Sequence, residues 1–198
     1  MAKNVFLSFR YSDGHKYKEE ITALFDKSID TVDFSEDQNR SNMSDYTIQS
    51  YLYSKLRRSS VTILILTPEA VRHQKDYWGR YNDWIYDELR YSLEDRGNNR
   101  TNGLIAVYTP GAESEICKRN PGCTTTIYDF DNLARKNMMN VKPSYKKNSE
   151  PGVYDRDYDS YCSLVPLDEF KRDFVNLIGI ASWKRDNKYR YDIVKRIK

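Results

Sequence analysis

A doubly wound α/β domain, in which helices cover both faces of a parallel sheet, is the fold that this sequence predicts. Three short runs, residues 4–9, 61–67 and 103–109, are rich in β-branched and aromatic residues and show no clean polar alternation. Runs that are apolar on both faces are typical of central strands in a parallel sheet. Helical periodicity separates these runs, and such alternation with short loops specifies right-handed crossovers.

Four strands and three helices are expected in the first 109 residues. A weaker strand at 31–34 joins the three strong ones. Asp13 is expected to cap the first helix and Ser44 or Asp45 the second, while the third helix is expected over about 80–95. The helices are indicated by apolar residues at helical spacing, which are Tyr17, Ile21, Leu24, Phe25 and Ile29, then Ile48, Leu52 and Leu56, then Ile85, Leu89 and Leu93.

The strand and helix pattern dissolves after residue 109. Residues 110–165 are rich in Pro, Gly, Asn, Lys and Tyr, and we expect an irregular, Tyr-rich insertion with short strands at 124–128 and 161–165. A structureless stretch of this length inside a compact domain is often functional or mobile. The insertion is therefore a region in which to look for function.

A final helix and a basic tail follow the insertion. The helix is expected to start near Asp168, and its apolar residues are Phe170, Phe174, Leu177 and Ile178. Residues 183–198 hold seven Lys or Arg against two Asp, and we expect this tail to be a solvated or frayed end. We interpret residues 1–198 as a single domain, with a core at 4–109, an insertion at 110–165, and a C-terminal helix and tail at 166–198.

Composition argues against several classes of function. The formal net charge of +3 comes from nearly balanced acids and bases, so no overall field attracts nucleic acid. The longest apolar run, 61–66, is too short to cross a membrane. His15 and His73 are the two histidines, and neither stands at ligand spacing from a cysteine, so no metal site is expected. An odd number of cysteines and no apolar leader before residue 10 favour a reduced, cytoplasmic setting.

Ligands of an open parallel sheet bind outside the carboxyl ends of its strands, where the strand order reverses. The first loop there, residues 8–14, lacks the glycine spacing of a dinucleotide-binding turn, and the chain has no P-loop. A bound dinucleotide is therefore not expected to be a redox cofactor. Arg10 is either a bidentate phosphate ligand or the partner of a nearby carboxylate such as Asp13 or Asp33, and the local sequence leaves both open.

Glu88 is the stronger candidate for a functional residue. On a helical wheel it lies beside the buried stripe of Ile85 and Leu89, one turn after Trp84, while Asp87 points away. A carboxylate at the edge of an apolar face is partly desolvated, and it can hold ribose hydroxyls or stabilise a developing cation. The alternative is an ordinary boundary glutamate that bonds to Arg90, Arg80 or a tyrosine.

The order of these pieces resembles a known family. The run Val5-Phe6-Leu7-Ser8-Phe9-Arg10-Tyr11-Ser12-Asp13 is similar to the first box of TIR domains, and more closely to the TIR-like proteins of the bacterial Thoeris antiphage system. The strand run 59–67 is similar to their third strand, and Trp84 followed by Glu88 matches the family's tryptophan and catalytic glutamate. The resemblance covers residues 4 to about 109.

This resemblance implies a flavodoxin-like fold and, in enzymatic members, cleavage of the bond between nicotinamide and ribose in NAD. NAD would then be a substrate, with no resident cofactor. Glu88 would be catalytic, and Phe9, Arg10, Asp13 and Trp84 would line the substrate pocket. The product would be a cyclic or modified ADP-ribose that activates a partner effector protein. A phage-derived trigger and self-association on activation are also implied.

Three further expectations concern the details. The Tyr-rich insertion is expected to act as a lid that stacks on adenine and keeps water from the cation. The polar loop 37–44 lacks the proline and glycine common at that position in animal TIR adaptors, which does not support adaptor-style docking. A non-catalytic TIR-like scaffold and a nucleoside ribosyl-transferring enzyme remain the alternatives to an NAD-consuming enzyme.

Overall fold

The computed structural model describes residues 3–25, 31–33, 45–72, 84–95, 100–122 and 124–197. Several sequence-based predictions fall outside these residues: Ile29, Phe34, the loop 37–44, the cap Ser44, and the part of the third helix before residue 84. For Asp45, Ile48 and Trp84 the structure describes the backbone only. The remaining predictions can be compared with the fold.

Five parallel strands form the main sheet of the described chain. They are β1 (Lys3–Ser8), β2 (Thr31–Asp33), β3 (Val61–Leu66), β4 (Gly103–Tyr108) and β7 (Cys162–Pro166), in the order β2-β1-β3-β4-β7. The chain builds outward from β1 to β2 on one side and then crosses to β3 on the other, which is the doubly wound topology that the sequence predicts. All residues of β3 and β4 are buried, as their apolar runs require.

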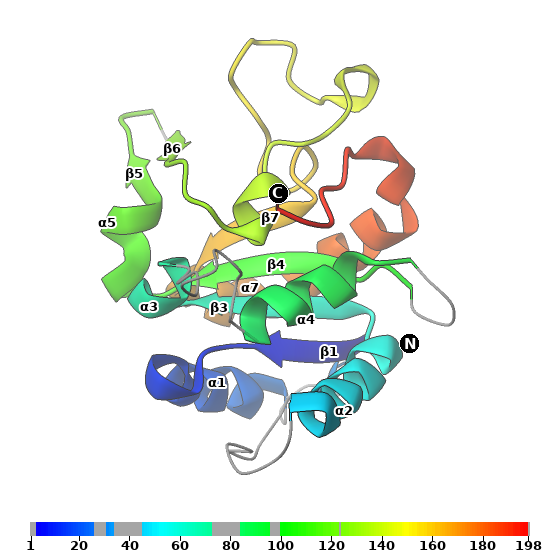
Figure 1. The fold of residues 1–198 in the computed structure, drawn as a ribbon. Helices are drawn as coiled ribbons and strands as arrows, with labels where there is room; N and C mark the ends of the chain where they lie inside the picture. Colours follow the sequence, from blue (N-terminus) through cyan, green and yellow to red (C-terminus); the bar gives the residue numbers. More distant parts are fainter. Residues whose placement is uncertain are drawn as a thin grey trace.

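Helices cover both faces of this sheet (Figure 1). The helices α1 (Tyr11–Phe25) and α7 (Leu167–Asp186) share one hydrophobic core with the sheet. On the other face lie α2 (Asp45–Arg58) and α4 (Trp84–Leu93), with the short helices α3 (Pro68–Val71), α5 (Glu113–Ile116) and α6 (Leu133–Lys136). The described side chains of the predicted apolar stripes are buried or packed against these cores, which confirms the helical periods.

One predicted helix boundary is wrong. Asp13 lies in the first turn of α1, which begins at Tyr11, and is not its N-cap. The backbone N–H of Gly14 bonds to the Arg10 carbonyl at 2.8 Å, so the first turn begins before Asp13 and encloses it. An acidic side chain in that turn still complements the positive end of the helix dipole.

The described residues of the insertion form short helices, strands and turns, and they fall into two parts. Its first part holds the turn η1 (Pro110–Ala112), α5, the hairpin of β5 (Cys117–Arg119) and β6 (Thr125–Ile127), and α6. This part packs beside α3 at the carboxyl ends of the strands, because Arg72 forms a 2.7 Å ion pair with Glu115 and the Asn132 amide donates to the Ala70 carbonyl. The strand expected at 124–128 is confirmed.

The Tyr-rich part, residues 137–161, has contacts near the start of β4 and also reaches the first turn of α7, where Arg156 pairs with Glu169. The Tyr161 hydroxyl donates to the carbonyl of Asn102, the residue before β4, at 2.7 Å. Trp183, in the last turn of α7, makes an edge contact with Tyr158. Because α7 runs antiparallel to the strands, its last turn lies at their amino ends. Tyr158 and Tyr161 therefore lie near the amino ends of the strands, and the lid stays a prediction.

Two features near the C-terminus differ from expectation. The strand expected inside the insertion at 161–165 is β7, which pairs with β4 as an edge of the main sheet. The basic tail is not frayed: Val194 N–H donates to the Asn137 side chain, Arg196 pairs with Glu94, and Ile197 N–H donates to the Tyr86 hydroxyl. The tail after the turn η3 (Lys188–Arg190) thus lies along α4. None of the described helices is long and apolar enough to span a membrane.

Candidate functional site

The candidate site lies where the strand order reverses, between the carboxyl ends of β1 and β3. The chain leaves β1 through Phe9 and Arg10 into α1, and it leaves β3 through Thr67 into α3. In an open parallel sheet this crevice is the place where ligands bind. The predicted substrate-binding residues Phe9, Arg10 and Asp13 therefore all stand at the expected position.

Packing and pairing hold the end of β1 in place. The Phe9 ring packs on Gly14, where an added Cβ would lie 3.1 Å from the Cβ of Phe9. Arg10 pairs with Glu69 at 3.7 Å, and the Ser12 hydroxyl donates to the same carboxylate at 2.9 Å. Glu69 is thus a carboxylate beside Arg10 that sequence reasoning missed. Its position three residues after the central strand β3 was the available signal.

Glu88 is held in the middle of α4 with only 8% of its surface exposed. Its neighbours on the helix, Ile85 and Leu89, are buried in the core, as the helical wheel predicts. Arg90, one of its predicted partners, pairs with Asp87 at 3.3 Å and with Glu94 at 3.2 Å. Low exposure strengthens the electrostatic interactions of a carboxylate with a developing positive charge.

Two hydrogen bonds of Ser92 fix the position of Glu88 along the direction of the strands. One turn after Glu88, the Ser92 hydroxyl lies 2.9 Å from that of Thr62 near the start of β3, and it bonds to the Glu88 carbonyl at 2.8 Å. Because α4 runs back toward β4, Glu88 lies about 6 Å nearer the carboxyl ends than Ser92. That displacement is close to two residues of strand, which is about 6.6 Å. Glu88 is therefore level with Leu64 of β3.

Ser8 is the neighbour of Leu64 across the β1–β3 pairing, and it shares a face with Phe6, which packs toward α2. The Ser8 side chain is fully buried, yet its hydroxyl has no hydrogen-bond partner among the described residues. The Oδ1 atom of Asp13 is likewise buried without a partner there. Unsatisfied buried polar atoms are costly and are concentrated at functional sites. Sequence reasoning did not single out Ser8.

Tyr108 at the end of β4 and Cys117 at the start of β5 lie at the same edge of the sheet. Burial raises the pKa of Tyr108 to about 12, although the hydrogen bond to Arg119 works in the opposite direction. Burial also raises the pKa of the adjacent Cys117 thiol, and it raises that of Cys162 in β7 to about 12. Both described cysteines are free and buried. Neither has the lowered pKa that a nucleophilic thiolate requires.

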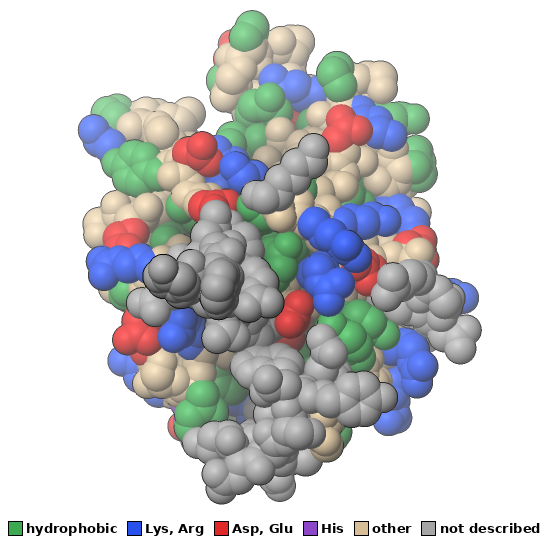
Figure 2. Space-filling view, in the orientation of Figure 1, with side chains coloured by type: hydrophobic (Ala, Val, Ile, Leu, Met, Phe, Trp, Pro, Cys, Tyr) green, Lys and Arg blue, Asp and Glu red, His purple; other side chains and the backbone are tan. Residues whose placement is uncertain are grey.

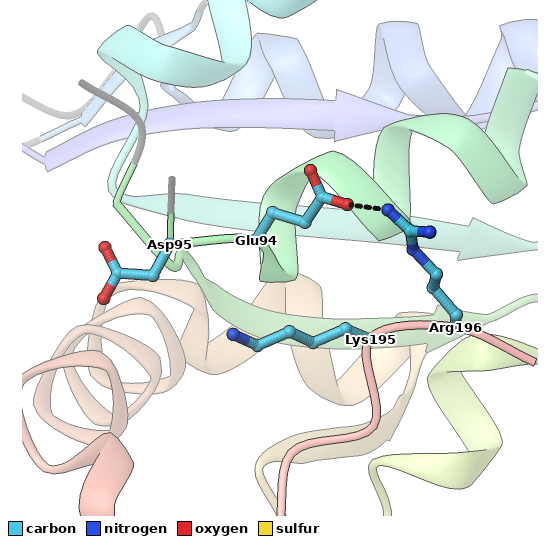
Figure 3. A pocket seen from close by; sticks show the side chains of 4 residues that line it. All are labelled: Glu94, Asp95, Lys195 and Arg196. Carbon is cyan, nitrogen blue, oxygen red and sulfur yellow. Dashed lines mark hydrogen bonds and ion pairs between the residues drawn. The ribbon is translucent and has the colours of Figure 1, made fainter. Parts of the chain in front are cut away.

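A cavity of about 460 Å³ lies at the other end of α4, lined by Glu94, Asp95, Lys195 and Arg196. Figure 3 shows Glu94, in the loop after α4, facing Arg196 of the tail, with which it forms a 3.1 Å ion pair. The hydrogen bond to Lys188 lowers the pKa of Asp95 despite some desolvation. The charges of this cavity compensate one another, and the cavity lies away from the strand ends that carry Arg10. We therefore do not assign the substrate site to it.

The described residues contain no group of three or more His, Cys, Asp or Glu side chains arranged to hold a metal ion. The candidate site in the described chain therefore contains four polar groups. They are the carboxylate of Glu88, the guanidinium of Arg10 and the unsatisfied oxygens of Ser8 and Asp13. Cation, hydroxyl and carboxylate groups of this kind suit a phosphate- and ribose-bearing ligand. Trp84 begins α4 one turn before Glu88.

The parallel sheet with helices on both faces is that of a TIR-like α/β domain of the flavodoxin-like type. Residues 6–114, more than half of the chain, match the family described as Thoeris protein ThsB, TIR-like domain. The chain belongs to this family. A search of curated proteins found no match. The family match spans Phe9, Arg10, Asp13, Trp84 and Glu88, and it ends just after the first turn of the insertion.

Proposed function

We propose that this protein consumes NAD, cleaves the bond between nicotinamide and ribose, and makes a cyclic or modified ADP-ribose that activates a partner effector in antiphage defence. The observation that carries the proposal is the position of Glu88, which is nearly buried and stands toward the carboxyl ends of β1 and β3 in a chain of the ThsB family. The activity itself is inferred from this position.

In the proposed reaction the bonding electron pair leaves with nicotinamide, and a positive charge develops on the anomeric carbon of the ribose. The Glu88 carboxylate stabilises this cation and accepts hydrogen bonds from the ribose hydroxyls. Arg10 pairs with the pyrophosphate, releasing Glu69. A nucleophile within the same molecule then attacks the cation and loses its proton, which closes the ring.

The unsatisfied oxygens of Ser8 and Asp13 support this assignment. In the described structure each lacks a partner, and a substrate with several hydroxyl groups supplies one. We propose that Ser8 positions the ribose beside Glu88 and that Phe9 forms a wall of the pocket. Self-association on activation, in response to a phage-derived trigger, completes the proposal.

The test is a product analysis with matched variants. Concentrated protein is incubated with NAD, with and without lysate from phage-infected cells, and nicotinamide and all adenine-containing products are resolved by chromatography and mass spectrometry. Glu88→Gln is compared with Asp87→Asn, because Asp87 is a carboxylate on the same helix that pairs with Arg90. Nicotinamide and a cyclic or conjugated ADP-ribose, lost in Glu88→Gln alone, support the proposal. An unchanged NAD pool in every sample supports a scaffold, and turnover of nucleosides in place of NAD supports a ribosyl-transferring enzyme.

A further inference from the structure

The Tyr-rich segment and the end of α7 form an exposed surface far from the proposed site. We call it the aromatic–cationic face. It lies near the amino end of β4, because Tyr161 in the same segment bonds to the Asn102 carbonyl. Figure 2 shows hydrophobic and basic side chains next to one another over the upper part of the molecule, where Figure 1 places this segment. The residues of the face are Tyr145, Lys146, Lys147, Tyr154, Tyr158, Trp183, Tyr189 and Arg190.

Rings and cations alternate across this face. The Arg190 guanidinium lies 5.0 Å from the ring centroid of Tyr145 and 5.1 Å from that of Trp183. Two edge contacts extend the cluster, from Tyr145 to Tyr189 at 5.8 Å and from Trp183 to Tyr158 at 5.4 Å. Two lysines complete it, with Lys147 lying 4.8 Å from the centroid of Tyr158 and Lys146 lying 4.4 Å from that of Tyr154.

The face is rigidly supported from below. The fully buried Asp159 accepts hydrogen bonds from the backbone N–H groups of Lys147 and Asp155 through its two oxygens. The fully buried Lys184 donates to the Ser160 carbonyl at 2.9 Å. A surface held in one conformation loses little conformational entropy when a partner binds.

Large aromatic side chains stay exposed on this rigid support. Between 38% and 58% of the surface of Tyr145, Tyr154, Tyr158 and Tyr189 is accessible to solvent. Single exposed aromatics are ordinary, but contiguous ones mark interaction sites. Tyr, Trp and Arg are also the residue types that dominate the binding energy of protein interfaces.

The charge that this face offers to a partner is positive. Three of the four acidic residues of the segment are engaged: Asp159 bonds to backbone N–H groups, Asp155 pairs with Lys147, and Asp157 pairs with Arg156, while Glu150 is exposed. Lys146 and Arg190 have no carboxylate partner in the described part of the chain. A partner that places carboxylates against these two cations gains complementary charge.

We propose that the aromatic–cationic face binds an acidic polypeptide surface. A cation already covers one face of four of its rings, so these rings are less suited to stacking on successive bases than the bare platforms of single-strand binders. The nearly balanced charge of the whole chain also disfavours a polyanion. This proposal does not depend on the NAD chemistry, because the face lies at the opposite edge of the sheet from Arg10.

Selection from a display library of random peptides tests the proposal. The full chain is the bait, and binding of the enriched synthetic peptides is measured by fluorescence anisotropy. The test variants are Tyr154→Ala and Arg190→Ala. The control is the double variant Lys118→Ala/Tyr128→Ala, which removes an exposed lysine and an exposed tyrosine from the other part of the insertion. Thermal unfolding verifies that each variant is folded.

The proposal predicts that enriched peptides are rich in Asp and Glu, that each test variant weakens their binding about tenfold or more, and that the control does not. Peptides without acidic enrichment, binding that the test variants leave unchanged, or no enrichment above background would overturn it. A labelled single-stranded DNA of 20 nucleotides and sedimentation of the free protein are measured in parallel. DNA binding, or a dimer, that the test variants abolish would assign the face to a nucleic acid or a second copy instead.

Discussion

Substituting Lys184 by methionine should change how the stability of the fold depends on pH. Lys184 is fully buried in α7, where its ammonium group donates to the Ser160 carbonyl at 2.9 Å and to the Ser163 hydroxyl at 2.6 Å. Burial lowers the pKa of this lysine from 10.5 to about 8. Methionine has a similar length and does not titrate, so it removes the charge while filling the same space.

The sign and size of the effect follow from this pKa. Between the folded-state pKa of about 8 and the ordinary value of 10.5, the unfolded chain binds a proton that the folded protein has lost. The free energy of unfolding therefore rises with pH across this window, and the contribution is lost as the pH falls below about 8. Each pKa unit corresponds to about 1.4 kcal/mol. Deprotonation of Lys184 therefore raises the free energy of unfolding by about 2 kcal/mol between pH 7 and pH 9.5.

A neighbouring thiol has the opposite effect. Burial raises the pKa of Cys162 from 9.0 to about 12, so the unfolded chain ionises first and stability falls as the pH rises above 9. Both proteins should therefore carry Cys162→Ala. Urea denaturation at pH 7 and pH 9.5 then gives the difference between the lysine and methionine forms. From pH 7 to pH 9.5 the free energy of unfolding of the lysine form should rise by about 2 kcal/mol more than that of the methionine form. A difference that stays constant within about 0.5 kcal/mol would refute the assignment of a buried, depressed lysine.

Two other substitutions probe the fold and the site. Gly103→Ala should destabilise the protein by about 4 kcal/mol or more, because the new Cβ would lie 2.1 Å from the Ala181 carbonyl oxygen, and thermal unfolding of the variant beside wild type measures this. A loss below about 1 kcal/mol would show that α7 and β4 are not so closely packed. Ser8→Ala should change stability by less than about 1 kcal/mol, since no described residue bonds to its hydroxyl, while raising the KM for NAD about tenfold. Unchanged steady-state kinetics would remove Ser8 from the proposed pocket.

The elements that sequence reasoning located correctly are those whose pattern is set by burial. β3 and β4 are apolar on both faces because helices cover both faces of the sheet, and α4 shows its buried stripe at Ile85, Leu89 and Leu93. The position of Glu88 at the edge of that stripe follows from the same periodicity. Local patterns of this kind are readable without knowledge of distant partners.

The features that sequence reasoning missed depend on contacts between residues far apart in the chain. The short run of β7 reads like any other strand, and only its pairing with β4 makes it an edge of the sheet. The basic tail resembles a solvated end, yet Arg196 reaches Glu94, which is 102 residues away. The Tyr-rich segment was assigned to the site from composition, which does not predict that Tyr161 bonds to the residue before β4. Composition does not record which end of a sheet a segment occupies.

The most direct test of the central claim is the initial rate of nicotinamide release from NAD by wild type, Glu88→Gln and Asp87→Asn, measured together at high protein concentration with lysate from phage-infected cells. The proposed role of Glu88 predicts that wild type and Asp87→Asn release nicotinamide at similar rates. It also predicts that Glu88→Gln is slower by about a hundredfold or more while its thermal unfolding is unchanged. Equal rates for folded Glu88→Gln and wild type would contradict the account.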